Sequence, residues 1–384
     1  MNRLVERKDI IVGFPNPPWD NFPGEVRAFL PDFIANMGGI PQVATVIPQN
    51  YGLRMNPDLD YRRVNIEVVT TNEEVYRASD LVISLKFPDF RQLSRMPVSS
   101  LLVSMIHFPT KPDRVDFLNQ QQISGVSLDS VADANGKRVV QDMEGAAWNA
   151  LNVAFGYLEQ TGSPLLKKKS LNALILGHGQ MGIPAQDATL HWGGIKTETP
   201  LPPVEATWVG RAVTEQRRTQ FLDLLENADI LIDASARPGT NLLTPVIYNE
   251  ELSRFPEDGI IIDLSADPYS KFMVKAVEGI PHGTLSRYIF EPKSPLYDQY
   301  VPDDIPHSQK RLTFSCEAWP GIHPEQSIRH YQEQLRPLMV ALFSLGVNVS
   351  QIYERIASDS AHPLVRALYR GSLKSVAPIL VATG

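Results

Sequence analysis

Short apolar runs alternate with longer amphipathic stretches along this chain. Five runs before residue 132 have the length and the β-branched content of buried strands, at residues 9–15, 42–48, 81–87, 101–108 and 124–131. A longer stretch, residues 142–160, instead repeats apolar side chains every three or four positions, at Met143, Ala147, Ala150, Leu151, Ala154 and Leu158. That period predicts a helix with one apolar stripe, and the alternation of strands and helices predicts an α/β fold.

The clearest motif lies at residues 171–182, where an apolar run leads directly into a G-x-G-x-x-G turn. In such a turn the first glycine allows the tight bend, the second lets a pyrophosphate approach the backbone, and the third allows close packing of helix on strand. The N–H groups at the start of the following helix would bind the phosphates. Two later strands, at residues 228–236 and 258–267, strengthen this prediction of a dinucleotide site. We assign these residues to the cofactor: Gly177, Gly179, Gln180, Met181 and Gly182.

Composition narrows the class of protein. A chain of 384 residues suggests two or three domains, and 43% hydrophobic with 21% charged residues is ordinary for a soluble globular protein. The net charge of -7 argues against nucleic-acid binding as the main function. The single Cys316 forms no intrachain disulfide, which fits a reducing compartment and predicts a cytoplasmic protein.

Membrane and metal sites have little support in the sequence. No stretch reaches the roughly 20 apolar residues of a membrane span, and the apolar run near the N-terminus is too short for a signal peptide. The histidines never stand in an H-x-x-x-H or H-E-x-x-H arrangement, so we expect no metal.

Two successive strands end alike, in a basic residue followed by Phe-Pro. Lys86 ends residues 81–87 in this way, and His107 ends residues 101–108. Ligands of doubly wound sheets bind outside the carboxyl ends of the strands, so both side chains would point into one crevice. The alternative is that both lie at ordinary solvated strand ends.

With these strand ends and several further motifs, the sequence resembles the family of alanine dehydrogenases, transhydrogenase N-terminal domains and saccharopine dehydrogenases. The stretches "PGEVRAFLP", "ASDLVISLKFP", "SMIHF", "IIIDLSAD" and "EAWPGIHPEQS" are similar to its motifs, in the same order along the chain. The resemblance implies that Arg27 binds a substrate carboxylate, that Lys86 contacts the substrate, and that His107 and Asp267 lie in the active site. It also implies NAD or NADP as the cofactor and an amino acid or 2-oxo acid as the substrate.

The implied chemistry is hydride transfer at the amino-bearing α-carbon, through an imine that water attacks. Arg27 suits a carboxylate, and Lys86 suits a carboxylate, a carbonyl oxygen or the role of base. His107 titrates nearest neutrality and is the candidate for proton transfer. Asp267 would orient the water or favour the iminium, unless it serves only as a strand-end turn or helix cap before Pro268.

The sequence departs from alanine dehydrogenases after Asp267, where their glycine-rich continuation is absent and "DLSAD" is closer to saccharopine dehydrogenases. Residues 284–321 form a long segment that either shapes a larger pocket or is a surface excursion. Glu317 stands near the acidic residue of the saccharopine group, which implies a substrate role. An N-substituted, saccharopine- or opine-like amino acid is therefore a possible substrate beside a simple amino acid.

Cofactor choice depends on the end of the second strand of the cofactor domain. An acidic residue there binds the ribose hydroxyls of NAD, whereas this chain has Gly210 followed by Arg211. Glycine leaves room for a 2′-phosphate and arginine can pair with it, which favours NADP over NAD. The alternative is an ordinary strand-end arginine in a protein that accepts NAD. Ser235, after the strand at residues 228–236, completes the cofactor set.

The architecture that we predict is two Rossmann-like domains with doubly wound parallel sheets. The cofactor domain, residues 143–321, is inserted into a discontinuous substrate domain, residues 1–142 and 322–384. The family resemblance implies a homo-oligomer. The net charge and the lack of a long apolar stretch argue against a nucleic-acid or membrane partner. Two alternatives to an amino-acid dehydrogenase remain: a catalytically inactive nucleotide-binding regulatory protein, and a transhydrogenase-like subunit.

Overall fold

The chain folds into two units, Met1–Gln141 with Pro324–Gly384, and Asp142–His323. The computed structural model describes these residues: 10–16, 28–52, 61, 66–108, 111–197, 200–237, 242–265 and 268–375. Unit 1 (residues 1–141 and 324–384) is built from two segments that are far apart in the sequence. Unit 2 (residues 142–323) is continuous. Among the described residues, no helix is both long enough and apolar enough to cross a bilayer.

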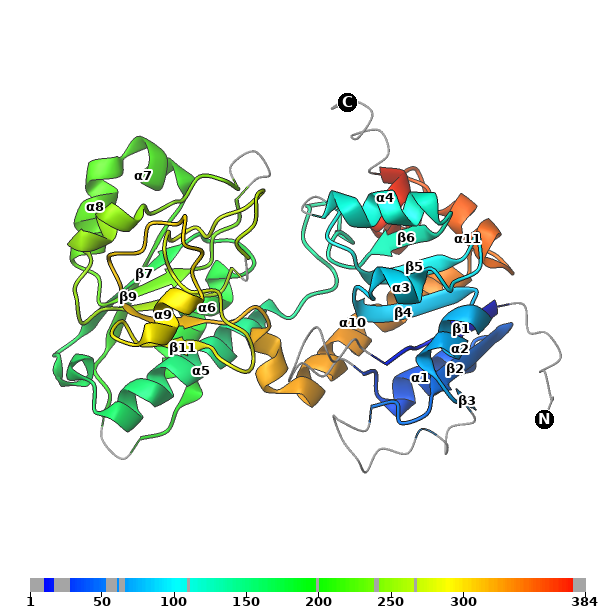
Figure 1. The fold of residues 1–384 in the computed structure, drawn as a ribbon, viewed down its shortest axis with the longest axis horizontal. Helices are drawn as coiled ribbons and strands as arrows, with labels where there is room; N and C mark the ends of the chain where they lie inside the picture. The colour runs from blue at the N-terminus through cyan, green and yellow to red at the C-terminus, as the bar shows by residue number, and fades with distance from the viewer. Residues whose placement is uncertain are drawn as a thin grey trace. The chain divides into compact units, whose positions relative to one another are not determined.

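Unit 1 contains a parallel sheet, whose described strands lie in the order β3-β2-β1-β4-β5-β6 (Figure 1). Its strands are β1 (Ile10–Gly13), β2 (Val43–Pro48), β3 (Glu67–Val69), β4 (Leu81–Lys86), β5 (Leu101–Met105) and β6 (Ser124–Ser127). Its helices are α1 (Pro31–Gly38), α2 (Asn72–Ala78), α3 (Phe90–Leu93), α4 (Pro112–Gln120), α10 (Pro324–Phe343), α11 (Val349–Arg355) and α12 (Pro363–Gly371). The strand order reverses between β1 and β4, so the carboxyl ends there form the place where such sheets bind ligands.

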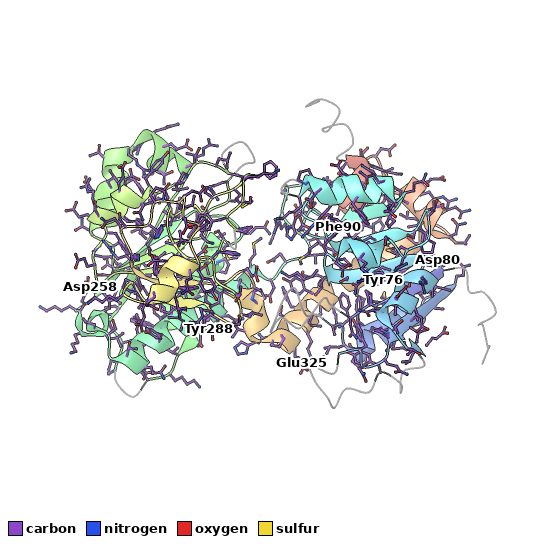
Figure 2. All side chains as sticks on the ribbon, in the orientation of Figure 1. Tyr76, Asp80, Phe90, Asp258, Tyr288 and Glu325 are labelled. Carbon is purple, nitrogen blue, oxygen red and sulfur yellow. The ribbon has the colours of Figure 1, made fainter. Side chains whose placement is uncertain are left out.

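Helices cover both faces of this sheet. One face packs against α1, α10, α11 and α12, through residues such as Phe33, Leu338 and Leu368. The other face packs against α2, α3 and α4, and Tyr76 of α2 is fully buried there (Figure 2). In Figure 1 the orange and red helices of the second segment lie beside the blue and cyan strands of the first. The apolar positions that α10 carries therefore complete the core that the N-terminal strands begin.

Unit 2 also contains a sheet of six described strands, in the order β11-β12-β10-β9-β7-β8. Its strands are β7 (Leu171–Leu176), β8 (Val204–Val209), β9 (Ile230–Asp233), β10 (Ile260–Asp263), β11 (Ile289–Phe290) and β12 (Leu312–Ser315). Its α-helices are α5 (Met143–Thr161), α6 (Gly182–Leu190), α7 (Arg211–Gln216), α8 (Arg218–Glu226) and α9 (Pro295–Gln299). All neighbouring strands are parallel except β11, which runs antiparallel to β12.

Alternate residues of these strands enter two cores, as expected for a sheet covered on both faces. Ile175, Ile232 and Ile262 pack with α5 and α6 on one face. Leu176, Leu231 and Ile261 pack on the other face with α8, whose Phe221 is fully buried. The strand order turns at β7, with β8 on one side and β9 on the other, so the crevice of unit 2 lies outside the carboxyl ends of these three strands.

The predicted α/β class, with two doubly wound sheets, is confirmed. The periodic stretch at residues 142–160 is α5, whose N-cap Asp142 accepts a hydrogen bond from the N–H of Gly145 at 3.1 Å. Three short strands, β3, β11 and β12, were not predicted. The segment at residues 284–321 is more than a surface excursion, because it contains β11, α9 and β12 and buries Tyr297 completely.

Candidate functional sites

The glycine turn of unit 2 follows β7 and precedes α6, as the motif predicts. Gly177 has φ +93°, and a Cβ at that position would lie 2.8 Å from the carbonyl oxygen of Ala234. At Gly182 a Cβ would lie 2.2 Å from the carbonyl oxygen of Gly177. Only glycine fits at either position, because the first would be strained and both would clash. At Gly179, by contrast, an added Cβ meets no heavy atom of the described residues within 4 Å.

The turn therefore leaves open space at its middle glycine, where a phosphate approaches the backbone of a dinucleotide-binding fold. Gln180 lies between Gly179 and α6, and Met181 is the N-cap residue of that helix. His178 stacks on the indole of Trp208 in β8, with ring centroids 4.1 Å apart and planes 12° apart. His178 thus fills space between the turn and β8.

A cavity of about 350 Å³ lies at the carboxyl ends of β7, β8 and β9. Four of the predicted cofactor residues line it together: Gly177, Gly210, Arg211 and Ser235. Gly210 is the N-cap residue of α7, and no described heavy atom lies within 4 Å of a Cβ built there. Ser235 is held at the end of β9, where its N–H and its hydroxyl donate to Asp233 Oδ1 at 3.0 and 2.6 Å. The residues fit the ribose and phosphate portion of a dinucleotide.

Six polar lining residues were not predicted from the sequence: Thr214, Glu215, Arg218, Arg237, Thr244 and Tyr248. Arg218 of α8 pairs with Glu251, with its Nε 2.8 Å from Oε1, and also donates to the carbonyl oxygens of Thr214 and Val246. Arg237 donates from Nη1 to the carbonyl oxygens of Leu242 and Thr244. The contacts of Arg218 with Glu251 and Val246 join segments 33 and 28 positions apart in the sequence. The only signal in the sequence was the position of Arg237 shortly after a buried strand.

In unit 1, Lys86 is the last residue of β4, and the strand stops before Phe87-Pro88 as predicted. The pairing of β4 with β5 shifts register between Ile83 and Lys86, so Lys86 lies opposite Met105. Ser84 supports this irregularity, since its hydroxyl donates to the carbonyl oxygen of Lys86 at 2.7 Å. Such a bulge redirects the side chain that follows it.

His107 lies two residues beyond the end of β5, rather than on the strand itself. Its φ is +58°, a left-handed conformation that a non-glycine residue rarely adopts outside strained or functional positions. Three hydrogen bonds hold it there. The N–H of His107 donates to Ser127 Oγ at 3.2 Å and to Asp129 Oδ1 at 3.1 Å, and its carbonyl oxygen accepts from the N–H of Lys111 at 2.9 Å.

Asp129 follows β6, the next strand of the sheet, and was not predicted as a site residue. Its carboxylate is nearly buried, accepts a hydrogen bond from Ser127 Oγ at 2.7 Å, and has Oδ2 3.6 Å from Nδ1 of His107. Asp129 thus contacts both the backbone and the ring of His107. Figure 1 shows β4, β5 and β6 side by side, so Lys86, His107 and Asp129 follow three adjacent strand ends.

The surroundings of His107 act on its protonation. Burial lowers the pKa of the imidazole below its usual value, and the carboxylate of Asp129 opposes this change. The cations of Arg114, Lys86 and Arg138 lower the same pKa further. His107 is therefore biased toward the neutral form, in a group of cations that suits an anionic ligand.

Two predicted site residues, Arg27 and Asp267, lie outside the described residues. The strand that precedes Asp267 in the sequence, β10, ends at a buried ion pair, with Lys275 Nζ 2.6 Å from Asp263 Oδ2. Ser315 Oγ also donates to this oxygen, at 2.8 Å. Burial disfavours the carboxylate of Asp263, but these partners outweigh the effect of burial, and the pKa of Asp263 lies below its usual value.

The predicted substrate residue Glu317 lies just beyond β12, and its Oε2 is 3.6 Å from Nε2 of His282.

Lys86 and His107 belong to unit 1, whereas Glu317 and all of the assigned cofactor residues belong to unit 2. No group of three or more His, Cys, Asp or Glu side chains in the described part of the chain is arranged to hold a metal ion. The folds and sites together define a two-domain α/β protein with a dinucleotide-type glycine turn in one unit and a basic, His-containing site in the other.

Comparisons with known proteins agree with this class. Residues 28–145 match the family described as "Alanine dehydrogenase/PNT, N-terminal domain". An alanine dehydrogenase of Methanococcus maripaludis is 23% identical over 236 residues, which are 55% of this chain and 60% of that protein's length. The match thus spans less than two thirds of that relative.

Two solved structures share the fold. An L-alanine dehydrogenase aligns with a TM-score of 0.65 and 15% identity, over 94% of each chain. A transhydrogenase from Sinorhizobium meliloti aligns with a TM-score of 0.60 and 13% identity, over 87% of this chain and 94% of that one. The resemblance to alanine dehydrogenases and transhydrogenases that the motifs predict is confirmed by these matches.

Proposed function

We propose that this protein is an NAD(P)-dependent amino-acid dehydrogenase, an oxidoreductase that acts on CH–NH₂ or CH–NH donors. The observation that carries the proposal is His107, held in a strained conformation by Asp129 beside the strand end of Lys86. A strained, firmly held histidine among cations is typical of a site that moves protons on an anionic substrate. The similarity to alanine dehydrogenases supports the same reaction class.

In this proposal, unit 2 is the cofactor domain. Its glycine turn would hold the pyrophosphate, and the cavity lined by Gly210, Arg211 and Ser235 would hold the adenosine portion. A bound nicotinamide would supply the acceptor of the hydride from the α-carbon. Arg211 favours NADP over NAD, because a guanidinium can pair with a 2′-phosphate that an acidic residue would repel.

Unit 1 is the substrate domain. Lys86, with Arg27 from the sequence motif, would bind the carboxylate or carbonyl oxygen of the amino acid or 2-oxo acid. His107 in its neutral form would take a proton from the water that attacks the imine, and Asp129 would keep its ring oriented. Asp267 would orient the water or favour the iminium. The saccharopine-like motif at residues 263–267 and Glu317 leave a larger, N-substituted substrate within this proposal.

The test of the function is a screen of amines against 2-oxo acids, with the oxidation of NADPH and NADH followed by absorbance. We expect turnover with at least one pair of amine and 2-oxo acid. Binding of the nucleotide without turnover for any pair would contradict the proposal and would favour a regulatory nucleotide-binding protein.

Cofactor preference can be measured apart from turnover. We expect the protein to bind NADPH more tightly than NADH, and Arg211→Ala to weaken NADPH binding by about 10- to 100-fold, since hydrogen bonds between charged groups are lost. NADH binding should change much less. Calorimetric titration of both nucleotides checks this. Equal affinities in the wild type, or an NADPH affinity that the substitution leaves unchanged, would remove Arg211 from the site.

The pH profile of the reaction tests His107. Because burial and the nearby cations lower its pKa, the acid limb of kcat/KM for amine oxidation should have its midpoint below the usual histidine value of about 6.5. Activity is lost as the pH falls through this midpoint, since the protonated ring is no base. Asp129→Asn removes the anion that raises the pKa while keeping an oxygen acceptor, so the limb should move to still lower pH.

A limb that Asp129→Asn leaves in place, or moves to higher pH, would separate Asp129 from the titrating group. The profile of kcat adds a further check, because it reports the complex with substrate. A bound carboxylate offsets the cations near His107, so the midpoint in kcat should lie at higher pH than in kcat/KM.

A further inference from the structure

One charged pair of unit 2 stands inside the cavity at the carboxyl ends of β7, β8 and β9. Arg211 Nε lies 2.7 Å from Glu215 Oε1, and both side chains line the cavity. They are the first and fifth residues of α7 and lie on the same face of the helix, one turn apart. With 59% and 51% of their side chains exposed, both remain accessible to a ligand.

Glu215 brings an acidic group into the cavity, although the strand that precedes α7 has no acidic residue at its end. In dinucleotide-binding folds that use NAD, an acid at the end of the second strand accepts hydrogen bonds from the ribose hydroxyls. The corresponding strand is β8, which is followed by Gly210 and so has no carboxylate at its end. Glu215 brings a carboxylate into the same cavity from one turn further along.

The other two arginines of the cavity are bound to the protein itself. Arg218 contacts Glu251 and two carbonyl oxygens, and Arg237 contacts the carbonyl oxygens of Leu242 and Thr244. Exchanging these contacts would leave several partly buried polar groups without partners, which carries a cost. The pair of Arg211 and Glu215 is exposed and spans one helical turn, and pairs of that kind are weak. It can therefore exchange partners at little cost.

We infer that Arg211 and Glu215 together determine which nicotinamide nucleotide this protein accepts. Glu215 accepts hydrogen bonds from the ribose hydroxyls of NAD, and Arg211 leaves Glu215 to bind the 2′-phosphate of NADP. NAD thus contacts the acidic residue of the pair, and NADP contacts the basic residue. Because a carboxylate repels a phosphate, Glu215 also limits the affinity for NADP. The inference rests on the proposed function, which requires a nicotinamide nucleotide in this cavity.

The experiment is the substitution Glu215→Gln, with NADPH, NADH, adenosine 2′-monophosphate and adenosine 5′-monophosphate titrated calorimetrically into the whole chain. NADH affinity should fall by about 10-fold, the size of one hydrogen bond to a charged group, while affinity for NADPH and the 2′-monophosphate rises. Binding of the 2′-monophosphate should also depend more steeply on salt. In the double variant Arg211→Ala, Glu215→Gln the gain for NADPH should be largely lost, because the guanidinium that pairs with the 2′-phosphate is gone.

A matched control is the pair of Glu325 and Arg329 on α10 of unit 1, labelled in part in Figure 2. It has the same spacing, a distance of 2.9 Å and a similar exposure, so Glu325→Gln removes an equivalent charge and should change neither nucleotide affinity. Parallel changes of NADH and NADPH in Glu215→Gln, or no change in their ratio, would overturn the inference. If the wild type binds neither nucleotide, the proposed function itself fails, which is a different result.

Discussion

Replacing His107 by alanine, or Lys86 by methionine, should lower the turnover of the preferred amine and 2-oxo acid pair by about 10²- to 10⁴-fold, the usual contribution of a general acid–base group. Cofactor affinity should stay within a few-fold of wild type, because both residues belong to unit 1 and the glycine turn belongs to unit 2. Steady-state kinetics and calorimetric titration of NADPH separate the two effects.

The left-handed backbone of His107 calls for a second variant. Alanine is strained at φ +58°, so part of the loss in His107→Ala could come from a displaced loop. Asparagine tolerates this conformation and has no group that titrates near neutral pH. His107→Asn should therefore lose as much turnover as the alanine variant. A near-normal rate across the pH range in both variants would exclude His107 as the proton-transfer group.

Replacing Lys275 by methionine should destabilise unit 2 by about 3–5 kcal/mol, since breaking a buried ion pair leaves one charge without its partner. Lys275 and Asp263 are both fully buried, with Nζ and Oδ2 2.6 Å apart. The pair stands at the end of β10, beside Ser265 and Ser315, which also donate to Asp263. Chemical denaturation monitored by circular dichroism measures the loss in the free energy of unfolding.

A control of similar geometry exists within the same unit. Lys168 Nζ also lies 2.6 Å from an aspartate, Asp229, but 37% of its side chain is exposed. Asp229 keeps a hydrogen bond from the N–H of Asn172, so Lys168→Met should cost only about 0–1 kcal/mol. Adding Asp263→Asn to Lys275→Met should restore part of the stability by removing the stranded charge. Equal losses in the two lysine variants would show that burial does not govern the strength of these pairs.

The sign of the pH dependence follows from the carboxylate. The pKa of Asp263 is lower in the folded chain than its usual value, which is about 3.9 in an unfolded one. The stabilisation from this group is therefore present above about pH 3.9 and is lost as the pH falls through the folded-state pKa.

Local sequence patterns predicted the class of fold. They also predicted some of the residues in each candidate site. Runs such as residues 173–176 and 260–262 predict strands because burial on both faces of a parallel sheet requires continuous apolar residues. The glycines at 177, 179 and 182 predict the turn: a side chain at 177 or 182 would clash, and the glycine at 179 leaves open space beside the backbone. Lys86 and His107 were found because each stands where a strand pattern stops. Each of these signals is local, because it involves only a few neighbouring residues of the chain.

Very short elements escaped this kind of analysis. The strands β3 and β11 have three and two residues, too few for any period to be recognised. They exist because a neighbouring strand, β2 or β12, offers an edge on which to pair. From the sequence alone, the stretches that contain these two strands therefore had no recognisable strand pattern.

The partners of the candidate residues were decided by tertiary structure. Asp129 lies 22 positions after His107, and only the pairing of β5 with β6 brings the carboxylate to the ring. Lys275 pairs with Asp263 from 12 positions further along the chain, and Arg218 and Arg237 reach the cavity from separate segments. The sequence by itself thus predicted candidate site residues and the ends of the longer strands. Which of them share a site depends on the order of strands in each sheet, a long-range property that no local pattern of apolar and polar positions contains.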